Sequence, residues 1–174
     1  MLEKILDGKA LAEELNVALR EEISKTVKQT KIRPKLVTIM VGQDPGSKVY
    51  INIKQRACDF VGINSKNIQL ENKISIEKII EEINKLNNDK SVHGILLQLP
   101  LPKAFIPNIS EMIEHISPDK DVDGLNTVNK GKLFDYNEVL APCTPKGIIA
   151  LLEHYKIGLK GKDVVIINRS NLVG

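Results

Sequence analysis

The sequence predicts an α/β protein with a mainly parallel sheet. Three short apolar runs, residues 35–41, 93–99 and 163–167, have the length of strands buried on both faces, and the first of them has β-branched members. Segments with helical spacing of apolar residues lie between these runs, and alternation of strands with helices is typical of parallel sheets. The chain has 174 residues, 42% of them hydrophobic and 27% charged, which is the composition of an ordinary globular protein.

The first predicted helix covers residues 9–27. Apolar residues recur there at helical spacing, namely Leu11, Leu15, Ala18, Leu19 and Ile23, and Asp7-Gly8 provides a start signal. Pro34 and Gly42 bound the strand that follows. This first strand is therefore short and mostly apolar, with β-branched members, as expected for the interior of a parallel sheet.

The next helix carries the most informative side chains. Asp44-Pro45-Gly46 is a turn sequence and Ser47 is a suitable N-cap, so we expect a helix that begins at or just after Ser47 and ends near Gly62. Tyr50 and Lys54 are four residues apart and therefore share a face of this helix. The expected buried face is the neighbouring apolar stripe, which consists of Val49, Ile53, Ala57 and Phe60.

The later elements are predicted from caps and helix breakers. A short strand at 67–71 and a helix opening at Ser75 precede the strand at 93–99, which a Pro-Leu-Pro sequence ends. A short helix at 107–116, a polar loop at 117–124 and two short extended pieces within 125–141 follow. Thr144 as N-cap, with Pro145 at the first helical position, then opens a helix to about Tyr155.

The final predicted strand, 163–167, leads into the sequence RSNLVG. A strand and turn of this kind are the first elements of a dinucleotide-binding unit, so residues from about 160 look like the beginning of an unfinished second domain. The glycine fingerprint of such units is absent, because Asn168, Ser170 and Val173 stand where the three glycines would fall.

Candidate site residues follow the strands. Ligands of open α/β sheets bind beyond the carboxyl ends of the strands, and Tyr50, Lys54, Gln98 and Asp123 all converge on that edge of the predicted sheet. Taken singly, a solvated Lys54 and a packing role for Tyr50 remain open. Gln98 is a less common choice at the end of an apolar strand, because a buried amide needs hydrogen-bond partners.

Composition weighs against several partners. The net charge of +3 comes from dispersed basic residues and only 3% of residues are aromatic, so neither nucleic acid nor a membrane surface is expected as a partner. No apolar run approaches the length of a membrane span, the N-terminus lacks targeting features, and cytoplasmic residence is expected.

Metal binding and cysteine chemistry are not expected either. Asp119, Asp121 and Asp123 alternate as in calcium loops, but Lys130 occupies the twelfth position, where an EF-hand requires Glu. Cys58 and Cys143 are isolated and expected to be free thiols, and Cys143 is interpreted as a turn residue between two prolines.

Five segments stand in a characteristic order and spacing, namely SKVYINIKQRACDFVGI, GILLQLPLP, SPDKDVDGLN, APCTPKGI and NRSNLVG. Together they resemble the bifunctional methylenetetrahydrofolate dehydrogenase/methenyltetrahydrofolate cyclohydrolase family, and the resemblance runs from Leu6 to Gly174. It implies a three-layer N-terminal catalytic domain at residues 1–142. A connecting helix and the first strand of an incomplete Rossmann NADP-binding domain would then occupy residues 143–174. It also implies a homodimer whose substrates are one-carbon derivatives of tetrahydrofolate.

The implied activity is bifunctional. NADP would oxidise 5,10-methylenetetrahydrofolate to 5,10-methenyltetrahydrofolate, and water would hydrolyse this product to 10-formyltetrahydrofolate. The alternatives are a folate-binding fragment with cyclohydrolase activity alone, or a non-catalytic dimerisation module. Assays of NADPH formation, methenyltetrahydrofolate hydrolysis and folate binding separate the three.

The resemblance also implies residue roles. Tyr50 would stack on the folate, Lys54 would serve the cyclohydrolase step, and Gln98 would form a hydrogen bond near that lysine. The other implied substrate contacts are Leu99, Pro100, Leu101 and Asp123.

The implied cofactor site lies at the end of the chain. Arg169 and Ser170 would recognise the 2′-phosphate of NADP, beside Asn168, which stands where the family usually has Gly. Asn tolerates a positive φ better than most residues, so the turn is expected to survive this change.

Overall fold

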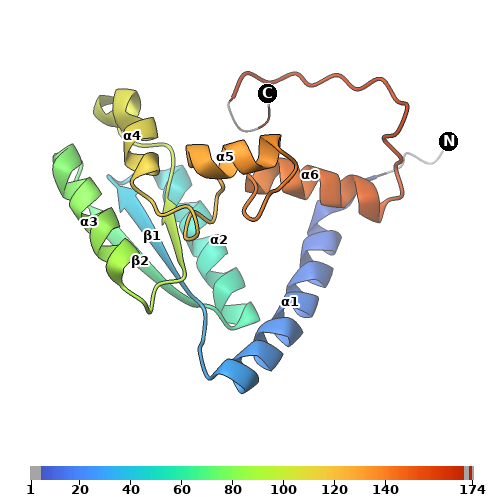
Figure 1. The fold of residues 1–174 in the computed structure, drawn as a ribbon, viewed down its shortest axis with the longest axis horizontal. Helices are drawn as coiled ribbons and strands as arrows, with labels where there is room; N and C mark the ends of the chain where they lie inside the picture. Colours follow the sequence, from blue (N-terminus) through green and yellow to red (C-terminus); the bar gives the residue numbers. More distant parts are fainter. Residues whose placement is uncertain (1–4, 171–172, 174) are drawn as a thin grey trace.

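The computed structural model describes residues 5–170 and 173. It shows an α/β protein built on a three-stranded parallel sheet with the order β2-β1-β3, where β1 is Lys35–Val41, β2 is Asn64–Leu70 and β3 is Gly94–Leu97. Helices cover both faces of this sheet, with α3 and α4 on one side and α2 on the other (Figure 1). The predicted fold class, an α/β fold with a parallel sheet between two helical layers, is therefore confirmed.

The central strand, β1, is the predicted apolar run and is paired along both edges. Ile39 lies opposite Ile68 of β2 and Leu97 of β3, so the strand interior contacts protein on every side. The edge strand β2 begins three residues earlier than predicted, because it pairs with the whole length of β1 from Lys35 onward.

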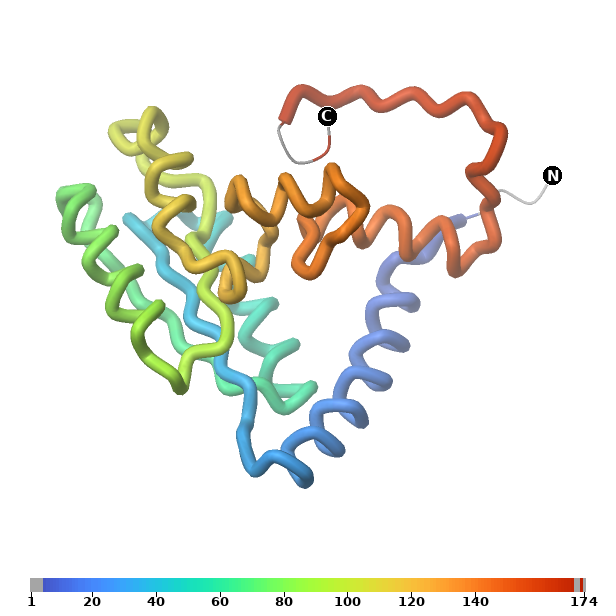
Figure 2. The backbone as a smooth tube through the Cα atoms, in the orientation of Figure 1, coloured from blue at the N-terminus to red at the C-terminus, as the bar shows by residue number. Residues whose placement is uncertain are grey.

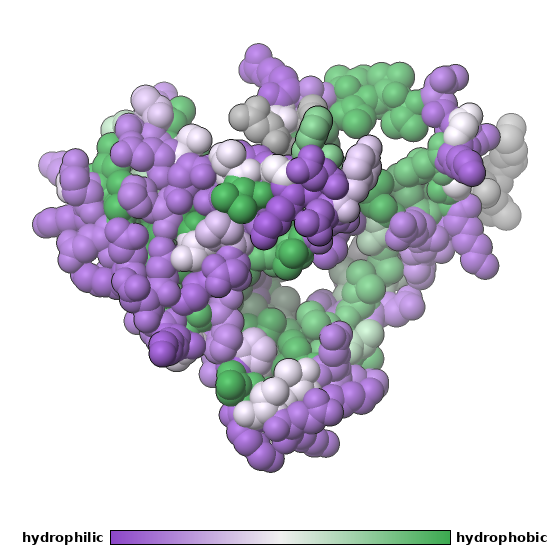
Figure 3. Space-filling view, viewed as in Figure 1, coloured by the Kyte–Doolittle hydropathy of each residue, from purple (hydrophilic) through white to green (hydrophobic). Residues whose placement is uncertain are grey.

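Helix α1, Gly8–Thr30, confirms the first predicted helix and is a turn longer. The Asp7 carboxylate caps it by accepting hydrogen bonds of 3.0 Å from the backbone N–H groups of Lys9 and Ala10. Only Leu11 and Ile23 of its apolar stripe are buried, and Leu15 and Leu19 are exposed. In the space-filling view, apolar side chains border the hollow between α1 and the rest of the molecule (Figure 3).

Helix α2, Pro45–Val61, differs from the prediction at its start. Its N-cap is Asp44, whose Oδ2 accepts a hydrogen bond of 2.7 Å from the Ser47 backbone, so Ser47 lies inside the first turn rather than at the cap. A proline in the first turn suits this start, since its missing N–H would have no helical partner there. Gly62 ends the helix as predicted, with a φ of +91°.

The predicted buried face of α2 is wrong. Val49, Ile53 and Phe60 are exposed, Ile53 to 59%, and Ala57 is half-buried. The buried residues are Ser47, Ile51, Cys58 and Val61. Apolar spacing indicates which side chains share a face, but which face meets the sheet depends on how the preceding turn directs the helix.

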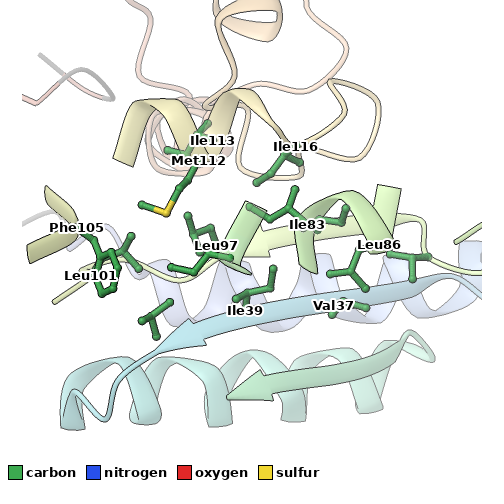
Figure 4. Close-up of a cluster of buried hydrophobic side chains, with 14 residues drawn as sticks. Val37, Ile39, Ile83, Leu86, Leu97, Leu101, Phe105, Met112, Ile113 and Ile116 are labelled. Atoms are coloured by element: carbon green, nitrogen blue, oxygen red, sulfur yellow. The ribbon is translucent and has the colours of Figure 1, made fainter. Parts of the chain in front are cut away.

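The main core lies between the sheet and the layer of α3 and α4 (Figure 4). Helix α3, Ile76–Asn88, begins after the predicted Ser75 cap and buries Ile79 and Ile83 completely. The single helix predicted at 107–116 is a 3-10 helix η1, Lys103–Asn108, followed by α4, Ile109–Glu114. The fully enclosed side chains of this core include Val37, Ile39, Ile79, Ile83, Val92, Ile95 and Met112.

Two predictions in the second half of the chain are wrong at the level of local structure. Residues 127–134 form helix α5, Thr127–Phe134, instead of extended pieces, because the Asn126 side chain caps the helix by accepting a hydrogen bond of 2.9 Å from Val128. Helix α6, Cys143–His154, starts before Thr144, and Pro142 occupies its N-cap position. Thr144 therefore lies in the first turn.

The segment after α6 runs back across α5 as an extended arm (Figure 2). The third strand predicted at 163–167 does not form there, and Ile167 is 95% exposed. An apolar run becomes a strand only where a neighbouring strand completes its hydrogen bonds, and in residues 5–170 this arm has none. The last residues of RSNLVG, 171, 172 and 174, lie outside the described part of the chain.

Candidate active site

A cavity of about 490 Å³ opens at the carboxyl ends of β1 and β3. Its walls are the first half of α2, the turn after β3, the loop that precedes α5 and the beginning of α6. The lining residues are Asp44, Gly46, Ser47, Tyr50, Lys54, Gln98, Leu99, Pro100, Asp123, Leu125, Pro142, Cys143 and Thr144. The structure thus brings together Tyr50, Lys54, Gln98 and Asp123.

Helix α2 directs an aromatic ring and an amine into this cavity. The turn that ends β1 places the first turns of α2 at the edge of the sheet, and Tyr50 and Lys54 both line the cavity from that helix. Tyr50 is 67% exposed, whereas Lys54 is half-buried. The ring therefore presents an open apolar surface, while the amine lies deeper.

Gln98 is held where β3 ends. Its backbone N–H extends the ladder by donating to the Ile39 carbonyl at 2.8 Å, and its side-chain Nε2 donates to the Leu99 carbonyl at 2.6 Å. Its Oε1 is buried without a hydrogen-bond partner within the described residues. Because buried polar atoms are nearly always paired in native proteins, this oxygen is available to a group that enters the cavity.

The Ser47 hydroxyl oxygen is a second buried polar atom at this cavity. Its side chain is only 3% exposed, and its Oγ has no partner in the part of the chain that the structure describes. Ser47 precedes Tyr50 by three positions and Lys54 by seven, so the same helical face carries all three residues.

Asp123 lines the cavity from the loop that precedes α5. Burial raises the pKa of its carboxyl group, while the positive charge of Lys54 and the thiol of Cys143 act in the other direction. The Cys143 Sγ lies 3.6 Å from Asp123 Oδ1. Both cysteines are free thiols, as predicted. Burial raises the pKa of the Cys143 thiol, and the nearby Asp123 charge raises it further.

The alternating aspartates that resemble a calcium loop have different surroundings in the fold. Asp121 is 2% exposed, and its Oδ2 accepts hydrogen bonds from the Asn126 backbone at 2.8 Å and from the Asn129 side chain at 3.0 Å. Asp121 therefore stabilises the loop, while Asp123 lines the cavity. No cluster of three His, Cys, Asp or Glu side chains within residues 5–170 could hold a metal ion.

The remaining predicted residues occupy other places. Leu99 and Pro100 line the cavity, but Leu101 is 5% exposed and belongs to the hydrophobic core. Arg169 and Ser170 line a second cavity of about 490 Å³, which shares Leu99 and Leu125 with the first. Asn168 does not line it, and its Oδ1 accepts a hydrogen bond of 2.6 Å from the Ser170 backbone.

Sequence reasoning missed two polar members of the site. The sequence predicts Ser47 as a helix N-cap, although its spacing from Tyr50 and Lys54 is a helical signal for a shared face. It predicts Cys143 as a turn residue and carries no local signal for a site role, because the partner Asp123 lies 20 residues earlier in the chain.

Residues 6–123 match the catalytic domain of tetrahydrofolate dehydrogenase/cyclohydrolase, which is more than half of the chain. The chain belongs to the tetrahydrofolate dehydrogenase/cyclohydrolase family. Residues 142–174 match the NAD(P)-binding domain of the same family. In the described residues, no helix has both the length and the apolar character needed to cross a membrane.

Relatives of this family member extend well beyond its length. The bifunctional protein FolD of Methanosarcina barkeri is 47% identical over 171 residues, which are 98% of this chain and 59% of that protein. The solved structure of the FolD methylenetetrahydrofolate dehydrogenase/cyclohydrolase from Campylobacter jejuni is 42% identical, with a TM-score of 0.92, and covers 97% of this chain and 59% of that one. The Trypanosoma brucei enzyme, solved with NADP cofactor and inhibitor, is 31% identical, with a TM-score of 0.91, over 97% of this chain and 57% of its own.

Proposed function

We propose that this chain binds one-carbon derivatives of tetrahydrofolate and acts as a bifunctional enzyme in the cytoplasm. Its two reactions are the NADP-dependent oxidation of 5,10-methylenetetrahydrofolate and the hydrolysis of the methenyl product to 10-formyltetrahydrofolate. The observation that carries the proposal is the single cavity that Tyr50, Lys54, Gln98 and Asp123 line together. We also propose residues 1–142 as the folate-binding domain and 143–174 as the beginning of the NADP-binding domain.

The cavity suits a folate. The exposed ring of Tyr50 offers an apolar face on which a flat pterin can stack, and the Asp123 carboxylate can accept hydrogen bonds from ring N–H groups. Leu99 and Pro100 add apolar surface to the cavity wall. A few placed polar groups within mostly apolar walls are typical of small-molecule sites.

The hydrolytic step needs a group that moves protons beside the one-carbon bridge. A water oxygen adds to the methenyl carbon and loses one proton, which leaves a hydroxyl group on that carbon. The bond from the carbon to N5 then breaks, N5 receives a proton, and the hydroxyl loses its remaining proton to become the formyl carbonyl, so that one proton is released overall. We assign this proton transfer to the Lys54 amine. Gln98 supports it as a neutral hydrogen-bonding partner, because a carboxylate in its place would hold the proton on the lysine.

For the oxidative step, we propose that Arg169 and Ser170 hold the 2′-phosphate of NADP. A guanidinium group and a hydroxyl group are suitable donors for a phosphate, and both residues line the cavity beside the folate site. NADP, when bound, supplies the acceptor for the hydride that leaves methylenetetrahydrofolate. Asn168 keeps the turn by bonding to the backbone of Ser170.

A second candidate is folate binding with cyclohydrolase activity alone. The positions of the two sites favour this candidate. The folate cavity lies entirely within residues 44–144, whereas Arg169 and Ser170, the proposed NADP contacts, lie on the extended arm, which joins no sheet within residues 5–170. Two assays of the purified chain distinguish the candidates. NADPH formation from methylenetetrahydrofolate supports the bifunctional proposal, and hydrolysis of methenyltetrahydrofolate without NADPH formation supports the alternative.

We further propose that the protein forms a homodimer through the outward face of α2. Val49, Ile53 and Phe60 leave an apolar face exposed on that helix, and exposed apolar patches on proteins mark interaction surfaces. An Ile53→Glu variant is expected to sediment as a monomer at concentrations where the wild type is a dimer. A monomeric wild type would contradict this part of the proposal.

A further inference from the structure

We propose that Cys143 is a positioning residue for folate binding: its thiol holds one oxygen of the Asp123 carboxylate, so that the other oxygen faces the ligand. This inference rests on the proposed function, because Asp123 is placed there as a pterin contact. It assigns a role to a cysteine whose sequence context indicated only a turn.

The backbone that carries Asp123 is already fixed by buried hydrogen bonds. The Asp121 carboxylate accepts hydrogen bonds from the Asn126 backbone N–H and from the Asn129 side-chain amide. Asn126 donates in turn to the Ile116 carbonyl at 3.2 Å. Because all three of these side chains are buried, the loop has little freedom around Asp123. What remains to be fixed is the torsion of the Asp123 side chain itself.

The start of α6 lies directly against this loop. Gly124 has a φ of +63°, and a Cβ atom placed on it would lie 2.7 Å from the Ala141 carbonyl carbon and 2.8 Å from the Pro142 nitrogen. Only a glycine allows this approach of two backbones. Cys143, the first residue of α6, is thereby carried over Asp123.

The Cys143 thiol has one hydrogen and two acceptors within reach. The Asp123 Oδ1 lies at 3.6 Å and the Val122 carbonyl oxygen at 3.5 Å. A charged acceptor forms the stronger hydrogen bond, so the thiol donates to Asp123 when that carboxyl group is ionised. This donation lowers the pKa of Asp123, against the burial that raises it.

Two further polar atoms of this cavity independently point to a ligand, because they are buried and lack hydrogen-bond partners within the described residues. Ser47, 3% exposed, has an unpaired Oγ, and Gln98 has a buried, unpaired Oε1, both among the described residues that line the same cavity as Cys143 and Asp123. A pterin bound in this cavity would meet these polar groups as well as Asp123. A carboxylate fixed by the thiol would bind it with less loss of side-chain freedom.

The test measures the Kd for tetrahydrofolate by calorimetry in the full chain. Cys143→Ala is expected to weaken binding about three- to tenfold, the range for one hydrogen bond, and Cys143→Ser is expected to restore it to within about twofold. Cys58→Ala removes the other thiol, which is buried in α2 outside the cavity, and is expected to leave Kd unchanged. Because removal of the donor raises the pKa of Asp123, the loss of affinity at low pH should begin at a higher pH in Cys143→Ala.

A double-mutant cycle with Asp123→Asn separates positioning from structural damage. If the thiol acts through the carboxylate, Cys143→Ala has little further effect in the Asp123→Asn background. An equal loss in both backgrounds, or an unchanged Kd and pH profile in Cys143→Ala, overturns the inference. A wild type that binds tetrahydrofolate but hydrolyses no methenyltetrahydrofolate overturns the proposed catalysis, while these Kd values still decide the role of Cys143.

Discussion

Replacement of Gly124 by alanine should be unusually costly, because this glycine combines two requirements. Its φ of +63° is disfavoured for residues with a Cβ, at a cost of about 1–2 kcal/mol. The new methyl group would also lie under 3.0 Å from the Ala141 carbonyl carbon, the Pro142 nitrogen and the Leu140 oxygen, all of them backbone atoms that cannot rotate away. Overpacking of this kind costs about 1–3 kcal/mol, so the expected loss of unfolding free energy is roughly 2–5 kcal/mol.

Gly62 provides the matched control. It has a φ of +91°, but a Cβ there would meet only the Ile23 side chain, at an ordinary 3.6 Å. Gly62→Ala should therefore cost only the conformational part, about 1–2 kcal/mol. Urea denaturation of both variants, followed by circular dichroism, measures the two losses of unfolding free energy. Equal losses in Gly124→Ala and Gly62→Ala would refute the claim that the loop and α6 are in close backbone contact.

Three further predictions concern the core, a helix cap and a titrating group. Ile83→Ala should lower the unfolding free energy by about 2–5 kcal/mol, because Ile83 is fully buried in the core. Val139→Ala, in the exposed segment after α5, should change it by less than about 0.5 kcal/mol, and chemical denaturation checks both. Ser75→Ala should cost about 1 kcal/mol by the same measurement, since the Ser75 hydroxyl caps α3 through the Lys78 N–H. Because burial raises the pKa of Asp123, its protonated carboxyl stabilises the folded state below the unfolded-state pKa, and this stability is lost as the pH rises through the folded-state pKa. Asp123→Asn does not titrate, so its stability relative to wild type should increase across that pH window. Thermal melts of both proteins from about pH 3 to about pH 8 measure this, and a difference in melting temperature that stays constant with pH would contradict it.

Much of the sheet and the placement of the site could be predicted from sequence, because their signals are local. The apolar run of β1 between Pro34 and Gly42 is legible without any partner, and so is the Ser75 cap of α3. Convergence of Tyr50, Lys54, Gln98 and Asp123 was predicted from one rule about parallel sheets, by which ligands bind beyond the carboxyl ends of the strands. Tyr50 and Lys54 lie on the helix that follows the first strand, Gln98 ends the second, and Asp123 lies in the polar loop predicted at the same edge.

The errors concern structure that depends on distant partners. The apolar stripe of Val49, Ile53 and Phe60 was interpreted as the core face of α2, but apolar spacing does not distinguish a face that meets the sheet from one left outside. The run at 163–167 has strand composition, yet it has no neighbouring strand within residues 5–170. Cys143 acquires its contact with Asp123 only through the close approach at Gly124.

The most direct test of the proposed function is the hydrolysis of methenyltetrahydrofolate by the wild-type chain and by Lys54→Met. The methionine keeps the length and apolar stem of the lysine but cannot carry a proton. We predict that the wild type hydrolyses the substrate, and that the variant keeps its circular dichroism spectrum and melting temperature but has no measurable turnover. Retained hydrolysis by a folded Lys54→Met variant would contradict the assignment of proton transfer to Lys54.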